Sequence, residues 1–136
     1  SGLYTHYYNT GQPQMTGNFK AMEDHNWVFY DTQGRHVKDE VYARQKLYGE
    51  TFYYYWPDGN KALVTYISLK YESQDYHTDI KHITEQYFYP NQRMSAEVRY
   101  LGDSLISTFY FSPQGEKVTK EAWEVDFLNA FRNQVK

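Results

Sequence analysis

Residues 51–60 read Thr-Phe-Tyr-Tyr-Tyr-Trp-Pro-Asp-Gly-Asn, an aromatic run that ends at a Pro-Asp-Gly turn. Proline restricts φ and glycine accepts a positive φ, so Pro57-Asp58-Gly59 can reverse the chain within a few residues. Aromatic residues favour extended backbone. The stretch therefore predicts a β-strand and its turn, and the mixed strand that runs on to Tyr66 completes a β-hairpin.

The same pattern occurs four more times along the chain. Each copy has an aromatic pair, a short polar turn and a strand that ends in an aromatic residue. The five copies run from Tyr7-Tyr8 to Phe19, from Phe29-Tyr30 to Tyr42, from Tyr55-Trp56 to Tyr66, from Phe88-Tyr89 to Tyr100 and from Tyr110-Phe111 to Trp123. The turn glycines are Gly11, Gly34, Gly59 and Gly115, and the fourth turn carries Gln92 where the other four carry glycine.

A lone β-hairpin is only marginally stable, whereas hairpins in tandem can pair edge to edge. We therefore predict an all-β fold, a single repeat domain over 1–136, in which the hairpins form one extended antiparallel meander sheet. A closed barrel or a β-sandwich with regular turns is the alternative. Val41–Glu50, which contains Gly49, links the second and third hairpins. Ser68–His82 breaks the pattern and is either a degenerate hairpin or an inserted loop.

The C-terminal segment changes its period. Phe127, Leu128, Phe131 and Val135 recur at helical spacing, and Asp126 can serve as an N-cap. We predict a short amphipathic helix over about 125–135 that packs on the sheet or caps its last strand, with Phe127, Leu128 and Phe131 facing the sheet. Capping would protect the open edge of a repeat array.

Composition excludes several classes of function. The chain has 16 Tyr, 8 Phe and 3 Trp, which favours many partly buried rings over a thick aliphatic core. The formal net charge is −3 and no basic stripe is present, so we expect no nucleic-acid partner. No apolar run approaches the roughly 20 residues of a membrane-spanning helix. The absence of cysteine excludes disulfides, thiol nucleophiles and thiolate metal sites.

Catalytic and metal-binding patterns are weak. The five histidines stand in no metalloprotease spacing, and phosphate-loop and nucleophile-elbow motifs are absent. Asp75, His77 and Asp79 would share one face of a strand and could hold a divalent cation, but we favour a solvated polar face. Glu121, Glu124 and Asp126 suit the N-terminal charge of a helix. We therefore expect no catalytic residues, no cofactor and no enzymatic activity.

The repeat resembles a known family. Tyr7-Tyr8-Asn9-Thr10-Gly11-Gln12, Met15-Thr16-Gly17-Asn18-Phe19, Trp27-Val28-Phe29-Tyr30 with Gly34, and Tyr54–Asn60 are similar to MORN-repeat variants, including YwqK-like antitoxins and repeats that precede some bacterial energy-transducer periplasmic domains. The resemblance covers about residues 4–123 and is clearest up to Tyr66. His25-Asn26-Trp27 lacks the glycine that many such repeats carry before the aromatic pair. The resemblance implies a scaffold-like β-repeat and supplies no catalytic residues.

The aromatic strands suggest a binding surface. In Thr51–Trp56, Phe52, Tyr54 and Trp56 alternate with Tyr53 and Tyr55, so both faces are aromatic. One short helix cannot cover both faces, and tyrosine is favoured at interfaces. We therefore expect a protein partner on a surface formed by Tyr53, Tyr55, Tyr30 and Phe88.

Two alternatives stay open for the function. Tyrosine and tryptophan platforms beside Asn, Gln and Asp would also suit a carbohydrate-binding module, and the family resemblance includes antitoxins. Ser1-Gly2 resembles a short addition before Leu3. That start and the energy-transducer similarity favour an extracytoplasmic location, periplasmic or surface-anchored.

Overall fold

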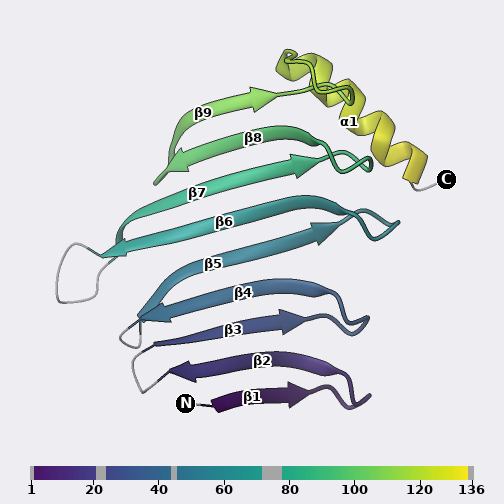
Figure 1. Ribbon diagram of the computed structural model, residues 1–136. Coiled ribbons are helices and arrows are strands. Elements are labelled where there is room, and N and C mark those ends of the chain that lie inside the picture. The colour runs from purple at the N-terminus through teal and green to yellow at the C-terminus, as the bar shows by residue number, and fades with distance from the viewer. Residues whose placement is uncertain (1, 21–23, 44–45, 72–77, 135–136) are drawn as a thin grey trace. The chain divides into compact units, whose positions relative to one another are not determined.

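The computed structural model describes residues 2–20, 24–43, 46–71 and 78–134. It contains nine strands and one helix in these ranges (Figure 1). They are β1 (Gly2–Tyr7), β2 (Pro13–Lys20), β3 (Asp24–Tyr30), β4 (His36–Ala43), β5 (Lys46–Tyr55), β6 (Lys61–Tyr71), β7 (Thr78–Phe88), β8 (Met94–Leu101), β9 (Ser104–Tyr110) and α1 (Lys120–Gln134).

The strands form one sheet in the order β1 to β9, which is the order of the chain. The register between each of the pairs β1–β2, β2–β3, β3–β4, β4–β5, β7–β8 and β8–β9 is antiparallel. The predicted antiparallel meander with a C-terminal helix is therefore confirmed, and the closed barrel and the sandwich are not the fold. Gly49 lies within β5, opposite Val41 of β4, rather than in the link between hairpins.

The chain divides into two compact units. Unit 1 holds residues 1–52 and 66–81, and unit 2 holds residues 53–65 and 82–136. Ser68–Tyr71 belongs to β6 and Thr78–His82 to β7, so the interval that breaks the repeat joins two strands of the meander. Its central residues, 72–77, lie outside the described residues.

The five aromatic-pair copies share one turn geometry. In each turn the N–H of the first residue donates to the carbonyl of the fifth, and the N–H of the fourth donates to the carbonyl of the first, at 2.7–3.0 Å. The turns are Tyr8–Gln12, Asp31–Arg35, Trp56–Asn60, Tyr89–Arg93 and Ser112–Glu116. The fourth residue has φ between 72° and 94° in every turn. This is the three-residue hairpin loop that ends in a left-handed residue.

Aromatic side chains tie neighbouring turns together. The first residue of one turn donates to the carbonyl just before the next turn: Tyr8 Oη to Tyr30 O at 2.6 Å in unit 1, Trp56 Nε1 to Phe88 O at 2.9 Å and Tyr89 Oη to Phe111 O at 2.6 Å in unit 2. These bonds fix the spacing of adjacent hairpins at their turn end, because each spans from one repeat to the next.

A close approach in unit 1 requires a glycine in the middle of a strand. Gly17 of β2 pairs with Tyr4 of β1 on one side and with Trp27 of β3 on the other. A Cβ atom on Gly17 would lie 2.2 Å from the Trp27 ring, so the indole occupies the space that a side chain would need. Tyr4 meets the same indole edge-on, with ring centroids 5.7 Å apart. Gly17 therefore lets one large ring cover the hairpin.

Lys38 organises the charged part of unit 1. Its neighbours across the strands are Phe29 of β3 and Phe52 of β5, and its Nζ lies 5.4 Å and 5.2 Å from their ring centroids. Glu40 and Glu50 face each other across β4 and β5, and Lys38 Nζ contacts both carboxylates, at 2.9 Å and 3.2 Å. Burial alone would lower the pKa of Lys38, but the bonds to the two carboxylates outweigh it and raise that pKa. Like charges opposite each other destabilise a sheet, so Lys38 has a structural role here.

The fifth copy departs from the prediction after its turn. Only an isolated bridge, Phe111 to Lys117, follows it, and the chain then enters α1. Trp123 therefore lies in the helix and does not end a strand. The helix begins at Lys120 instead of about 125, and Thr119 rather than Asp126 caps it, because Thr119 Oγ1 accepts from Ala122 N at 3.2 Å.

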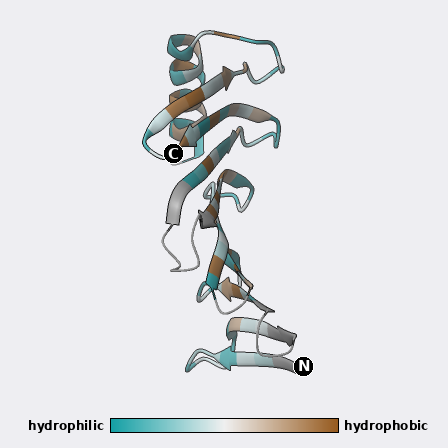
Figure 2. Ribbon diagram, turned by 90° about the vertical axis from the view of Figure 1, so that its left-hand side faces the viewer, coloured by the Kyte–Doolittle hydropathy of each residue, from teal (hydrophilic) through white to brown (hydrophobic). Residues whose placement is uncertain are grey.

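The core of unit 2 forms where α1 meets the turn end of the sheet. Among the described residues, Trp56, Val64, Tyr89, Ala96 and Val98 are the buried hydrophobic residues of this unit. The helix carries hydrophilic and hydrophobic stretches (Figure 2). Its packed residues are Trp123, Phe127 and Ala130, whereas Leu128 and Phe131 are 52% and 49% exposed. The expected sheet-facing set was therefore right for Phe127 and wrong for Leu128; Phe131 only borders Trp56, at 6.5 Å between centroids.

Candidate functional site

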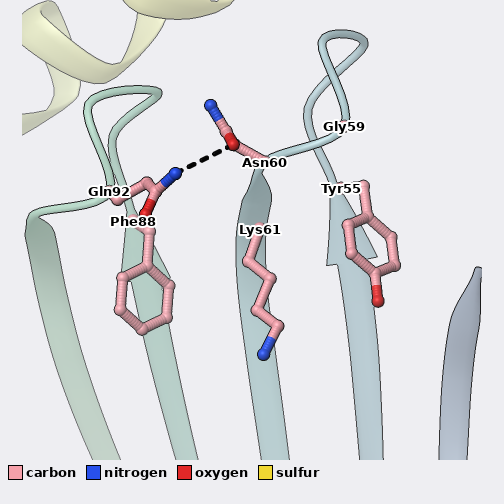
Figure 3. Close-up of a pocket in the computed structure, with 6 residues that line it drawn as sticks. All are labelled: Tyr55, Gly59, Asn60, Lys61, Phe88 and Gln92. Carbon is pink, nitrogen blue, oxygen red and sulfur yellow. Dashed lines mark hydrogen bonds between the residues drawn. The ribbon is translucent and has the colours of Figure 1, made fainter.

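Three strands of unit 2 bring the candidate site together at their turn ends. Tyr55 is the last residue of β5, Lys61 is the first residue of β6 and Phe88 is the last residue of β7. Because β6 lies between β5 and β7 in the meander, its first residue is placed beside the last residues of its neighbours. Figure 3 shows the rings of Tyr55 and Phe88 on either side of the Lys61 side chain.

These side chains border an open pocket of about 430 Å³. It is lined by Tyr55, Gly59, Asn60, Lys61, Phe88 and Gln92. The volume lies within the range of small-molecule sites. The two rings and the lysine stem supply apolar surface, while the lysine ammonium and two side-chain amides supply polar groups. The pocket thus joins two of the predicted surface residues, Tyr55 and Phe88, with four that the sequence did not single out as ligand-binding.

Tyr53 belongs to the same face. The Nζ atom of Lys61 lies 5.2 Å from the centroid of the Tyr53 ring, the geometry of a cation–π contact. Tyr53 and Tyr55 are both half-buried, whereas Tyr54 between them is 51% exposed and Trp56 is only 3% exposed. The strand therefore has two aromatic faces, as the alternation predicts, and its most exposed ring lies opposite Tyr53 and Tyr55.

Lys61 is the charged residue of the pocket lining. Its side chain is exposed, and the ion pairs found in the described part of the chain join other cations, namely Arg35, His36, Lys38 and Arg99, to carboxylates. The ammonium of Lys61 is thus held by an aromatic ring and keeps hydrogen-bond donors for a ligand.

Gln92 and Asn60 form the upper wall of the pocket. Gln92 Nε2 donates to Asn60 Oδ1 at 3.0 Å (dashed in Figure 3), and Asn60 Nδ2 donates to Pro90 O at 3.0 Å. Gln92 has φ 72° and is the non-glycine residue with positive φ among the described residues. Residues other than glycine rarely adopt this backbone region, and those that do cluster at functional sites.

Tyr30, the fourth residue of the predicted surface, does not line this pocket. Tyr30 ends β3 in unit 1, its carbonyl accepts the Tyr8 hydroxyl, and its ring is 6.1 Å from that of His36. Asp75 and His77 are outside the described residues, and of Asp79 only the backbone is described, in β7. Within the described ranges, no group of three histidine or carboxylate side chains is placed to hold a metal ion.

Sequence reasoning missed Lys61, Asn60 and Gln92 as site residues. Their common signal is their place in the repeat, since Asn60 is the fifth residue of its turn, Lys61 follows it, and Gln92 is the fourth residue of the next turn. Lys117 holds the same place after the fifth turn and also lies over a ring, 5.4 Å from the centroid of Phe109. The residue after the turn is lysine in only two of the five copies, so alignment of the copies would have given a weak signal, and it would not have shown that two adjacent turns share one pocket.

Comparison with protein-family models, curated proteins and solved structures finds no match to this chain. In the described residues, no helix is both long enough and apolar enough to cross a bilayer. The site therefore has to be interpreted from its own geometry.

Proposed function

We propose that this chain is a non-catalytic protein-interaction or scaffold module, of the MORN-variant type and from an extracytoplasmic bacterial repeat protein. The observation that carries the proposal is the surface formed by Tyr53, Tyr55 and Phe88 beside Lys61. Tyr55, Lys61 and Phe88 come from three strands and border an open pocket, and the Tyr53 ring lies under the Lys61 ammonium. The hydrophobic packing of unit 2 centres instead on the rings of Trp56, Tyr89 and Phe127.

Physical arguments favour a protein partner for this surface. Tyrosine is large, rigid and amphipathic, so it gains contact area at little entropic cost. The hydrogen-bonding capacity of Asn60 is mostly used within the protein, by Pro90 O and Gln92 Nε2. The surface therefore offers more apolar contact than free hydrogen-bonding groups, which suits a peptide segment.

The first prediction tests this surface with the double substitution Tyr53→Ser and Tyr55→Ser. We expect retention of a partner from an extract of the source organism to be lost, with little change in melting temperature. Tyr54→Ser is the matched control, because Tyr54 is on the same strand but points to the other face. Unfolding of the double variant would show that this face is core, and unchanged retention would place the partner elsewhere.

Carbohydrate binding is the second candidate function. It is favoured by one observation, the side-chain amide of Gln92 near the ring of Phe88 in the same pocket. Amides that bond sugar hydroxyls and rings that stack on sugar faces are suited to such a ligand. A glycan array separates the candidates, since binding to one sugar class that the double tyrosine variant loses would favour this second function.

A further inference from the structure

The pocket lined by Tyr55, Lys61 and Phe88 is positively charged, whereas the net charge of the whole chain is negative. The formal net charge of the protein is −3, yet the pocket lining contains one cation and, among the residues that line it, no carboxylate. The charge of the lining therefore favours a ligand with an anionic group. Complementary charge of this kind fixes orientation and excludes wrong partners more than it raises affinity.

The arrangement of the lining gives the ligand a second requirement. The Phe88 and Tyr55 rings flank the lysine stem, so apolar surface surrounds the path to the ammonium (Figure 3). The ammonium is held over the Tyr53 ring at 5.2 Å, at the part of the pocket away from the amides of Asn60 and Gln92. The best-matched ligand would therefore place an apolar group against the rings and an anion beside Lys61.

Gln92 provides an independent reason to regard the pocket as a site. The other four turns have glycine at this position, with φ from 84° to 94°, and the backbone there disfavours any side chain. The fourth turn nevertheless carries glutamine, and its side chain reaches the pocket wall. A turn that served only to reverse the chain would be better served by glycine.

We propose that the pocket binds an acidic peptide segment of a protein partner, one that carries a carboxylate next to an aromatic or aliphatic side chain. Lys61 binds the carboxylate, the rings of Tyr55 and Phe88 contact the apolar side chain, and Gln92 positions the segment through its side-chain amide. This inference rests on the proposed protein-interaction function and specifies the chemistry of the partner at that same surface.

Two blocked dipeptides test the inference directly. Acetylated phenylalanyl-glutamate amide and its phenylalanyl-glutamine counterpart differ by one charge at nearly constant shape. We expect the glutamate form to shift the amide signals of Asn60 and Gln92 in a nuclear magnetic resonance titration of the full chain. Its affinity should exceed that of the glutamine form by about fivefold, the upper end for solvent-exposed ion pairs.

Substitutions then assign the charge to one residue. Lys61→Met should abolish the preference for the glutamate form, and Lys117→Met should leave it unchanged. Lys117 is the matched control, because it holds the equivalent position after the fifth turn and lies over a ring at a similar distance. Gln92→Gly should weaken binding without lowering the melting temperature, since it restores the ordinary turn residue.

Equal affinity for the two dipeptides, or a preference that survives Lys61→Met, would overturn the inference. Acetate that shifts the same signals as strongly would show a bare anion site, and a stronger response to glucuronate would assign the pocket to acidic sugars; either result also overturns it. The proposed function is judged separately. If the double tyrosine variant loses its partner and Lys61→Met retains it, the interaction surface stands and the acidic-segment inference fails.

Discussion

At the scale of single residues, the turns show how one backbone angle selects the side chain. The fourth turn residue has a positive φ in all five turns, and four of them are glycine. The Pro-Asp-Gly and Asn-Thr-Gly turns make this angle predictable from the sequence, because glycine carries no Cβ that would clash at a positive φ. Gln92 could be located at the position where the other turns carry glycine, but its left-handed backbone could not be predicted, since residues with a Cβ adopt a positive φ only rarely.

The second prediction concerns Gly59. Its φ is +94°, and nothing lies within 4 Å of the position that a Cβ would take, so any cost of substitution comes from backbone strain. We expect Gly59→Val to lower the free energy of unfolding by about 1–2 kcal/mol. Gly49→Ala in β5 is the control, because a Cβ there makes only an ordinary contact, 3.5 Å from Ile67 O. Denaturant unfolding of both variants measures the difference, and an unchanged Gly59→Val protein would contradict the strained turn.

At the scale of elements, hydrophobic periodicity predicted that α1 is a helix but not which of its faces is buried. The spacing of Phe127, Leu128 and Phe131 correctly indicates a helix, but apolar residues occupy more than one side of it, so spacing alone cannot choose the buried face. Trp123 fixes that face. Its ring lies 5.5 Å from Tyr87 and 5.2 Å from Tyr110, and its Nε1 donates to Ser95 Oγ at 3.1 Å. These partners come from three different strands, and the sequence does not show which of them meet.

The third prediction separates the two faces of α1. Phe127 packs among the rings of Trp56, Tyr87, Tyr89 and Trp123, at centroid distances of 5.1–6.3 Å. Phe127→Ala should therefore lower the free energy of unfolding by about 2 kcal/mol or more. The loss should be smaller than for a fully buried ring, because Phe127 is half-buried. Leu128→Ala, one residue further along the helix and 52% exposed, should stay within about 0.5 kcal/mol of the parent. Similar losses in both variants would mean that a different face of the helix is packed.

At the scale of the whole molecule, the repeat predicted the strand order because each turn joins adjacent antiparallel strands. Closure into a barrel could not be judged from turn spacing, since a barrel and an open meander use the same hairpins. The candidate site was predictable only in part. Alternation placed Tyr53 and Tyr55 on one face, but the gathering of Lys61, Phe88 and Gln92 depends on which strand ends are neighbours and on their register.

Two tyrosines of unit 2, the buried Tyr89 and the half-buried Tyr87, should make the protein less stable at alkaline pH. Burial, followed by the negative charge of Asp126, raises the pKa of Tyr89 to about 12. Burial raises the pKa of Tyr87 to about 12 as well, with a contribution from Glu85. Unfolded tyrosine ionises near pH 10, roughly. The folded state thus holds these protons more tightly, and this contribution to stability is complete below about pH 10 and lost as the pH rises through 12.

The fourth prediction is that Tyr89→Phe reduces this alkaline loss. The variant should be less stable than the parent at neutral pH, because Phe111 O loses the hydroxyl that donates to it at 2.6 Å. Between pH 10 and 12, however, its free energy of unfolding should fall less steeply, since phenylalanine cannot ionise. Urea unfolding followed by circular dichroism across this range measures both effects. Tyr54→Phe is the control. The Tyr54 side chain is 51% exposed, so removal of its hydroxyl should leave the slope unchanged. Equal slopes for the parent and Tyr89→Phe would show that the Tyr89 hydroxyl reaches solvent in the folded protein, and the bond between the fourth and fifth turns would then have to be rejected.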